Sequence, residues 1–122
     1  AKESAYHLRH SQAWMIRLGD GTDESHAKVQ ESLDLLLPFA GDLFHSDETA
    51  STAASEGWGV DPAGLRAAWE ATLTETLEEA QLRRPDTAPE QVGGRVGRHT
   101  EQLSFLLAEM QVLPRTYPDA KW

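Results

Sequence analysis

The fold is decided by a stretch near the start of the chain that reads RLGDGTDESHAKV, residues 17–29. Gly19 is expected to stop one helix before a short turn. The side chain of Thr22 is typical of an N-cap. The carboxylates of Asp23 and Glu24, which follow it, are stabilising near the positive N-terminal end of a second helix dipole. Because residues 20–22 are the whole connection, the two helices must pack as an antiparallel hairpin.

Hydrophobic periodicity outside this stretch also indicates helices. No segment reads as a convincing strand. On the first helix we expect an apolar stripe to be buried and Lys2, Arg9 and Gln12 to face the opposite side. Asp61-Pro62 reads as an N-cap followed by proline at the first helical position. Four helices are predicted, over residues 2–18, 23–44, 61–80 and 99–113, and the stripe of the first consists of Leu8, Ser11, Trp14, Met15 and Leu18.

Prolines and glycines mark the breaks between these helices. Pro38 removes a backbone donor inside the second helix and should kink it. Residues 45–60 and 83–97 read as loops, and Pro114 and Pro118 should end the fourth helix, whose leucines we expect to be buried. The fold class is therefore all-α, a helical bundle of about four helices.

Composition excludes several classes of function. The 122 residues hold 11 Lys and Arg against 20 Asp and Glu, a formal charge of −9. Nucleic acid is excluded as a partner because a phosphate backbone needs a basic surface. An anionic membrane surface is disfavoured for the same reason, and no apolar run is long enough to span a bilayer. The absence of cysteine excludes disulfides and thiolate chemistry. We expect a cytoplasmic protein.

The length suits one domain, residues 1–122. Helical periodicity is present from the first residues, with neither an initiator Met nor a capping residue before them. A helix normally begins after a cap that satisfies its free N–H groups. We therefore expect a fragment that lacks its N-terminal half and binds that half as a partner.

Glu3 and His7 are the first candidates for chemistry. They are four residues apart, so their side chains are neighbours on one helix face. Di-iron carboxylate bundles use Glu-x-x-His twice, together with two further Glu, whereas here Tyr6 occupies the third position after Glu3. We predict a buried His7 that is hydrogen-bonded to a carboxylate or a carbonyl, and no metal site.

Two other patterns give weaker candidates. Asp23-x-x-His26 and Asp42-x-x-His45 lie at helix ends, where a structural role is expected. The run GGRVGRHT, residues 93–100, has glycines and two arginines before a helix, but it lacks the Gly-Lys-Ser/Thr ending of a phosphate-binding loop. It reads as a helix-starting loop, with a contact from Arg95 and Arg98 to a CoA phosphate as the alternative.

Two groups of residues resemble the C-subunit family of phenylacetyl-CoA epoxidases, along essentially the whole chain. The resemblance rests on these residues: Tyr6, His7, His10, Ser11, Trp14, residues 17–22 and 24–26, Trp69, Gly94, Arg95, Gly97, residues 99–101 and 106–111, Tyr117, Pro118 and Trp122. It implies a ferritin-like fold, of which this chain would be the C-terminal half.

The resemblance also implies a role. Such a subunit is a non-catalytic scaffold that pairs with a homologous catalytic subunit and other subunits of the complex. The catalytic subunit holds the di-iron centre, and the complex epoxidises the ring of phenylacetyl-CoA. This chain would then carry no cofactor and no catalytic residue, and Glu3 and His7 would be vestigial ligands.

Two alternatives remain open. The chain could belong to a divergent di-iron oxygenase whose other ligands lie in the missing half, or it could be an unrelated helical interaction module.

Overall fold

The computed structural model describes residues 2–86 and 89–121. The chain divides into two compact units, Ala1–Val92 and Gly93–Trp122. Within the described residues every element of regular structure is a helix, which confirms the all-α prediction. No helix in this described part is both long and apolar enough to cross a membrane.

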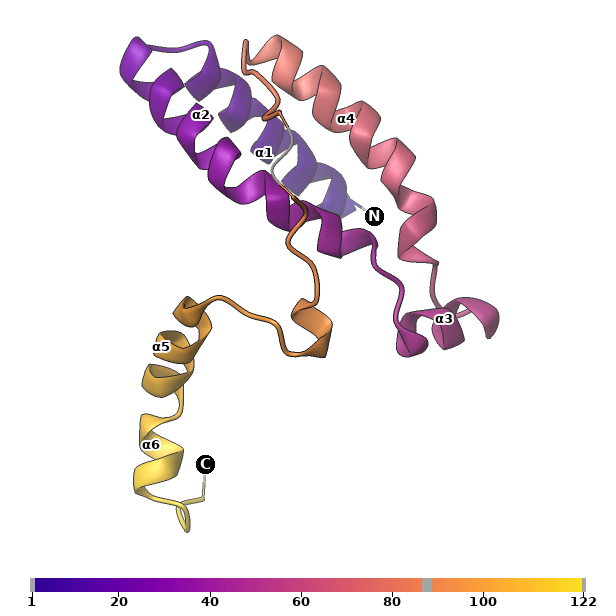
Figure 1. Ribbon diagram of the computed structural model, residues 1–122, viewed down its shortest axis with the longest axis vertical. Helices are drawn as coiled ribbons and strands as arrows, with labels where there is room; N and C mark the ends of the chain where they lie inside the picture. The colour runs from indigo at the N-terminus through magenta and orange to yellow at the C-terminus, as the bar shows by residue number, and fades with distance from the viewer. Residues whose placement is uncertain (1, 87–88, 122) are drawn as a thin grey trace. The chain divides into compact units, whose positions relative to one another are not determined.

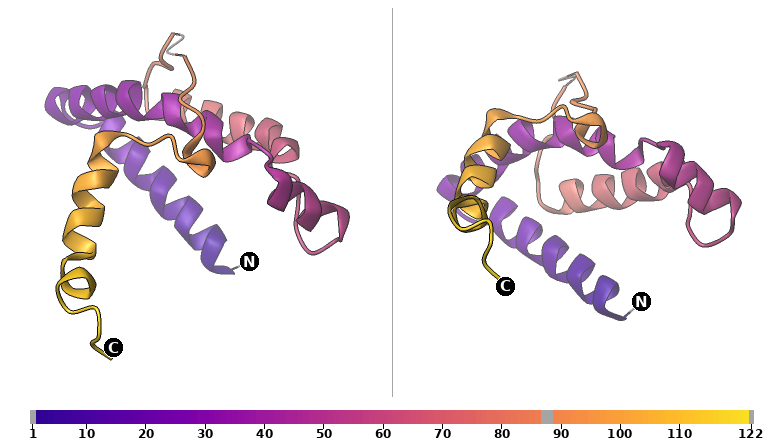
Figure 2. Two further views of the ribbon diagram at one scale, coloured as in Figure 1. Left: turned by 60° about the horizontal axis from the view of Figure 1, so that its bottom comes forward. Right: turned by 90° about the horizontal axis from the view of Figure 1, so that it is seen from below.

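The first unit is built on the predicted helical hairpin. The helices α1 (Lys2–Gly19) and α2 (Asp23–Leu36) run antiparallel, and α4 (Arg66–Glu79) packs against α1 (Figure 1). Towards its N-terminus α1 diverges from the other helices of this unit, as both views in Figure 2 show. The contacts of α1 are therefore concentrated in its C-terminal half.

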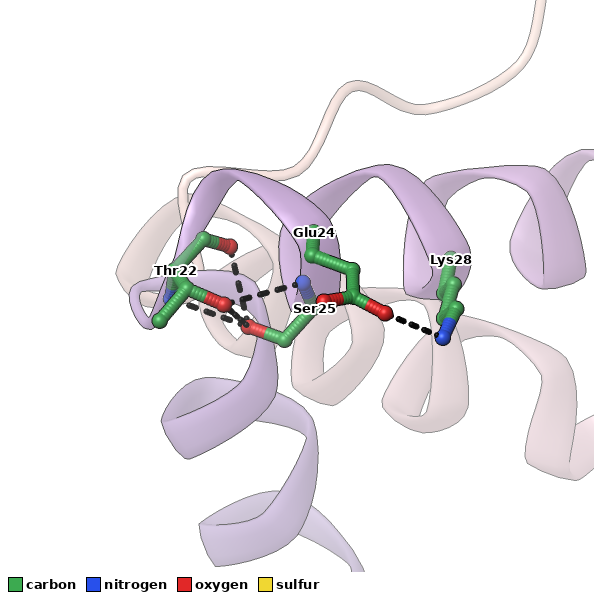
Figure 3. Close-up of polar contacts among 4 residues, drawn as sticks. All are labelled: Thr22, Glu24, Ser25 and Lys28. Atoms are coloured by element: carbon green, nitrogen blue, oxygen red, sulfur yellow. Dashed lines mark hydrogen bonds and ion pairs between the residues drawn. The ribbon is translucent and has the colours of Figure 1, made fainter.

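The start of α2 confirms Thr22 as its N-cap. The Thr22 hydroxyl accepts a hydrogen bond from the backbone N–H of Ser25 at 3.2 Å, and the Ser25 hydroxyl accepts one from the Thr22 N–H at 3.0 Å. Ser25 also donates to the carbonyl of Leu18 at 2.8 Å, so the cap of α2 is tied to the end of α1. Figure 3 shows this capping box beside the ion pair of Glu24 and Lys28.

Helix type changes at the proline of the second segment. The α-helix ends at Leu36, and the chain continues as the 3-10 helix η1 (Leu37–Phe44). The predicted extent of 23–44 is correct, but Pro38 lies in the first turn of η1 and does not kink the interior of an α-helix. A proline is tolerated there because the first N–H groups of a helix have no intrahelical acceptor.

The predicted loop over 45–60 contains a short helix. This is α3 (Glu48–Ser55), and the carboxylate of Asp47 caps it by accepting from the N–H of Ala50 at 2.7 Å. The loop prediction failed because a helix of small residues has no apolar stripe to detect. Asp61 caps the next segment as predicted, and the 3-10 turn η2 (Pro62–Leu65) leads into α4.

A small core holds the first unit together. Leu33, Leu77, Ala80 and Leu82 are its buried hydrophobic residues in the described part of the chain. Apolar side chains from α1, α2, η1 and α4 pack around them, namely Met15, Ile16, Val29, Leu37 and Leu73.

The face of α1 that packs on this core differs from the predicted stripe. Gln12, expected to face away, is partly buried and donates a hydrogen bond to the Thr76 hydroxyl at 3.1 Å. Leu8 and Trp14, expected to be buried, are 51% and 46% exposed. The prediction was wrong because α1 has apolar residues on more than one face, and only the packing partners decide which face is covered.

Gly19 ends α1 as predicted, but the reason for a glycine at this position differs from the expected one. It is the last residue of α1 and is buried, and it is not among the glycines with positive φ. A Cβ atom at Gly19 would lie 2.4 Å from the carbonyl oxygen of Ala80. Glycine is therefore needed here for the close approach of α1 to the end of α4, and not for a left-handed helix stop.

The second unit contains η3 (Gly94–Val96), α5 (Glu101–Met110) and α6 (Val112–Thr116). Pro114 lies inside α6, in its first turn, where proline is tolerated, so it does not end the helix as predicted. Leu106 and Met110, expected to be buried, are 53% and 67% exposed. Two short helices and a loop cannot cover their own apolar side chains.

Candidate functional site

The pair Glu3 and His7 lies in the first turns of α1. His7 Nε2 and Glu3 Oε2 are 3.3 Å apart, and their side chains are 71% and 90% exposed. His7 therefore has the predicted carboxylate neighbour, but the prediction that it is buried was wrong. It is exposed because this part of α1 has no helix packed against it within the unit.

This pair does not have the composition of a dinuclear metal centre. It offers one carboxylate and one imidazole, already paired with each other, and Tyr6 stands beside them with its ring 5.9 Å from that of His7. Among the described residues no group of three or more His, Asp, Glu or Cys could hold a metal ion. A di-iron centre needs two Glu-x-x-His pairs and two further Glu, so the residues described here do not fit one.

A row of rings along α1 was not recognised in the sequence. The rings of Tyr6 and His10 are stacked with centroids 5.9 Å apart, and the ring of His10 meets Trp14 edge-on at 6.4 Å. The guanidinium of Arg17 lies 5.4 Å from the centroid of the Trp14 ring. We call Tyr6, His10, Trp14 and Arg17 the aromatic row. Its spacing of four, four and three residues was the available signal.

The second candidate pattern, Asp23-x-x-His26, is explained by the hairpin. The Nδ1 atom of His26 lies 2.7 Å from the carbonyl oxygen of Gly19, so this imidazole joins the first turn of α2 to the last carbonyls of α1. The structural role expected for His26 is confirmed by this contact.

The glycine-rich run forms a turn before α5. Gly93 and Gly97 have positive φ, and the N–H of Arg98 donates to the carbonyl of Gly93 at 2.9 Å. The Arg98 side chain folds back over Gly93, where a Cβ atom would lie 2.8 Å from its Cδ. The helix-starting loop is thus present, while the contact of Arg95 and Arg98 with a CoA phosphate stays a prediction.

An ionic cluster that the sequence did not reveal holds residues 83–86 and 89–91 against the helices of the first unit. Arg84 Nη1 donates to Glu70 Oε2 at 2.5 Å, and Arg66 pairs with Glu90. The hydrogen bond from Arg84 lowers the pKa of the Glu70 carboxyl below its usual value. The N–H of Gln91 donates to the carbonyl of Pro38 at 2.8 Å. These partners are distant in sequence, so no local pattern predicts them.

Comparison with known proteins gives two concordant matches. A family model described as "Phenylacetic acid catabolic protein" matches residues 1–122. The chain is also similar to the C subunit of 1,2-phenylacetyl-CoA epoxidase from Escherichia coli (strain K12), with 46% identity over 121 residues. That alignment covers 99% of this chain and 49% of the relative, so the chain spans about half the length of the curated relative that it matches.

Proposed function

This chain belongs to the family of phenylacetic acid catabolic proteins, and from that membership we propose that it is a non-catalytic structural part of an epoxidase acting on phenylacetyl-CoA. The observation that carries the proposal is the similarity to the C subunit of such an epoxidase along 99% of the chain. Family membership across residues 1–122 also removes the alternative of an unrelated helical module.

The polar residues of α1 favour a structural role over a catalytic one. A general acid or base acts from a site that positions it against the substrate and sets its pKa. Glu3 and His7 are instead paired with each other, and among the described residues no third His, Asp, Glu or Cys joins them in a group that could hold a metal ion. By contrast, the partly buried polar contact of Gln12 with Thr76 joins two helices of the first unit to each other.

In this proposal the chemistry belongs to a partner. A homologous catalytic subunit would hold the di-iron centre and the substrate, and other subunits would complete the complex. This chain would supply packing surface, with Arg95 and Arg98 as candidates for a contact with the CoA phosphates. A cytoplasmic location stays a prediction.

The direct test is the epoxidation rate per assembled complex. His7→Ala and Glu3→Gln are introduced into the chain within a complex that contains the catalytic subunit, and the rate is divided by the amount of intact complex. We expect each variant to retain a rate within about threefold of the parent. A rate loss of about 100-fold or more at normal assembly, the scale of a lost general acid or base, would assign chemistry to this chain.

Metal content separates the scaffold from a divergent di-iron oxygenase. After anaerobic incubation with ferrous iron, we expect no stoichiometric iron in this chain when it is co-expressed with the half of the E. coli relative that the match leaves out. About two irons per chain that are lost in His7→Ala would overturn the proposal. Failure to co-purify with any catalytic subunit would overturn membership of the complex.

A further inference from the structure

We propose that the aromatic row of α1 is the surface onto which the other half of a C-subunit polypeptide packs, namely the part that the E. coli relative has outside the match. This inference goes beyond the scaffold role and beyond the expectation that the other half binds, because it assigns the face of α1 to which that half binds. It depends on the similarity to the E. coli relative and not on which chain of the complex performs the chemistry.

The geometry of α1 sets this face apart from the packed one. At about 100° per residue, Tyr6, His10, Trp14 and Arg17 fall within an arc of about 80°. The residues that face the core, Gln12, Met15, Ile16 and Gly19, lie in an arc centred about 170° away. The aromatic row is therefore on the side of α1 that faces away from the first unit's own core.

That side of α1 carries two large exposed rings among polar groups, whereas the outer face of an ordinary surface helix is charged or polar. Tyr6 and Trp14 are 56% and 46% exposed. The row is continuous over about 16 Å of helix, from residue 6 to residue 17, which is about three helical turns. Contiguous exposed aromatic surface of this kind marks an interaction site.

The N-terminal part of α1 also lacks support from its own unit. Every residue from Lys2 to Ser11 is exposed, and this is the part of α1 that diverges from the other helices in Figure 2. An isolated helix of about ten residues is marginal in water, because most helix stability in proteins comes from tertiary packing. A segment packed along the first three turns of α1 would stabilise this helix and bury its aromatic rings.

The occupant follows from the small core and from the length of the relative. Four hydrophobic residues are buried in the described part of the first unit, and none of them lies in α1. The alignment leaves about half of the E. coli relative unmatched, which is enough polypeptide for a facing pair of helices.

The experiment combines the 122-residue chain with the unmatched half of the E. coli relative, co-expressed with an affinity tag on that half. Hydrogen exchange of the chain is then compared with and without the half. We expect co-purification at one to one, and at least tenfold slower exchange of the α1 amides from residue 6 to residue 14. This arm contains no catalytic subunit and measures no turnover, so it fails or succeeds independently of the proposed function.

Matched variants locate the contact. Trp14→Arg should lower recovery of the complex at least tenfold. Trp58→Arg removes a tryptophan that is 71% exposed elsewhere in the first unit and should leave recovery unchanged. Because Trp14 faces away from the core, its variant should keep the parental circular dichroism. If Trp14→Arg is unfolded, the test rests on the recovery of the complex with Tyr6→Arg and on hydrogen exchange of the parent chain.

Three outcomes would overturn the inference. Equal recovery of Trp14→Arg and Trp58→Arg would show that the row is not the contact. Slower exchange of α1 in the chain alone, increasing with its concentration, would assign the face to a second copy. If α1 exchange were unchanged by the other half and slowed only in a separate sample to which the catalytic subunit is added, the face would belong to an interface between subunits.

Discussion

Gly19→Ala tests whether close approach of α1 and α4 organises the first unit. In an unhindered helix the added methyl group would stabilise the protein by up to about 1 kcal/mol, because Gly is the poorer helix former. Here the new Cβ would lie 2.4 Å from the carbonyl oxygen of Ala80 and 2.9 Å from its Cβ. The obstacle is backbone at a residue with no exposed surface, so it cannot rotate away.

The two effects oppose each other, and the steric one should dominate. Overpacking of a well-packed contact costs about 1–3 kcal/mol. A shift of Gly19 would also disturb the 2.7 Å contact between its carbonyl oxygen and His26. After subtraction of the helix-propensity gain we expect a net loss of about 1–2 kcal/mol, which corresponds to a decrease in Tm of about 5–10 °C for a unit of this size.

Gly64→Ala is the matched control, because a Cβ there would meet nothing within 4 Å. It should leave the free energy of unfolding unchanged or raise it by up to about 1 kcal/mol. Both free energies are measured by urea denaturation, followed by circular dichroism. If Gly19→Ala were as stable as the parent, or stabilised it as much as Gly64→Ala does, the close packing of α1 against α4 would be refuted.

Three further changes examine the core, the cap and the ionic cluster. Leu77 is 3% exposed, so Leu77→Ala should lower the free energy of unfolding by about 2–5 kcal/mol. Leu36 is 62% exposed, so Leu36→Ala should change the free energy of unfolding by less than about 0.5 kcal/mol. Similar losses in the two variants would contradict the described core. Thr22→Ala should cost about 1 kcal/mol in the same denaturation assay, and no loss would argue against the capping box. The Glu70 pKa is lower in the folded chain than in the unfolded one, so its stabilising contribution is present above the unfolded value of 4.5 and is lost as the pH falls through the folded value. Thermal melts between pH 6 and 3 should therefore decline less steeply for Arg84→Ala than for the parent, and parallel curves would show that this pair does not contribute.

Local chemistry was sufficient for the helical framework. The turn at residues 20–22, the Thr22 cap and the Asp61-Pro62 restart were all predicted, because caps and turns depend on residues within one or two turns of each other. The resemblance likewise identified the family, since long motifs are a property of the sequence itself. The exposed pair Glu3 and His7 was found from its spacing alone, although its exposure was not.

Tertiary structure decided what each face of a helix contacts. Gln12 packs and Trp14 does not, although periodicity suggested the opposite, because α1 has two apolar faces and the position of α4 selects one. Gly19 ends α1 as predicted, but a glycine is needed there for close packing, since the constraint comes from Ala80, sixty-one residues later. The pairing of Arg84 with Glu70 was likewise beyond sequence patterns. Periodicity shows that a face is apolar, but burial depends on which distant segment arrives to cover it.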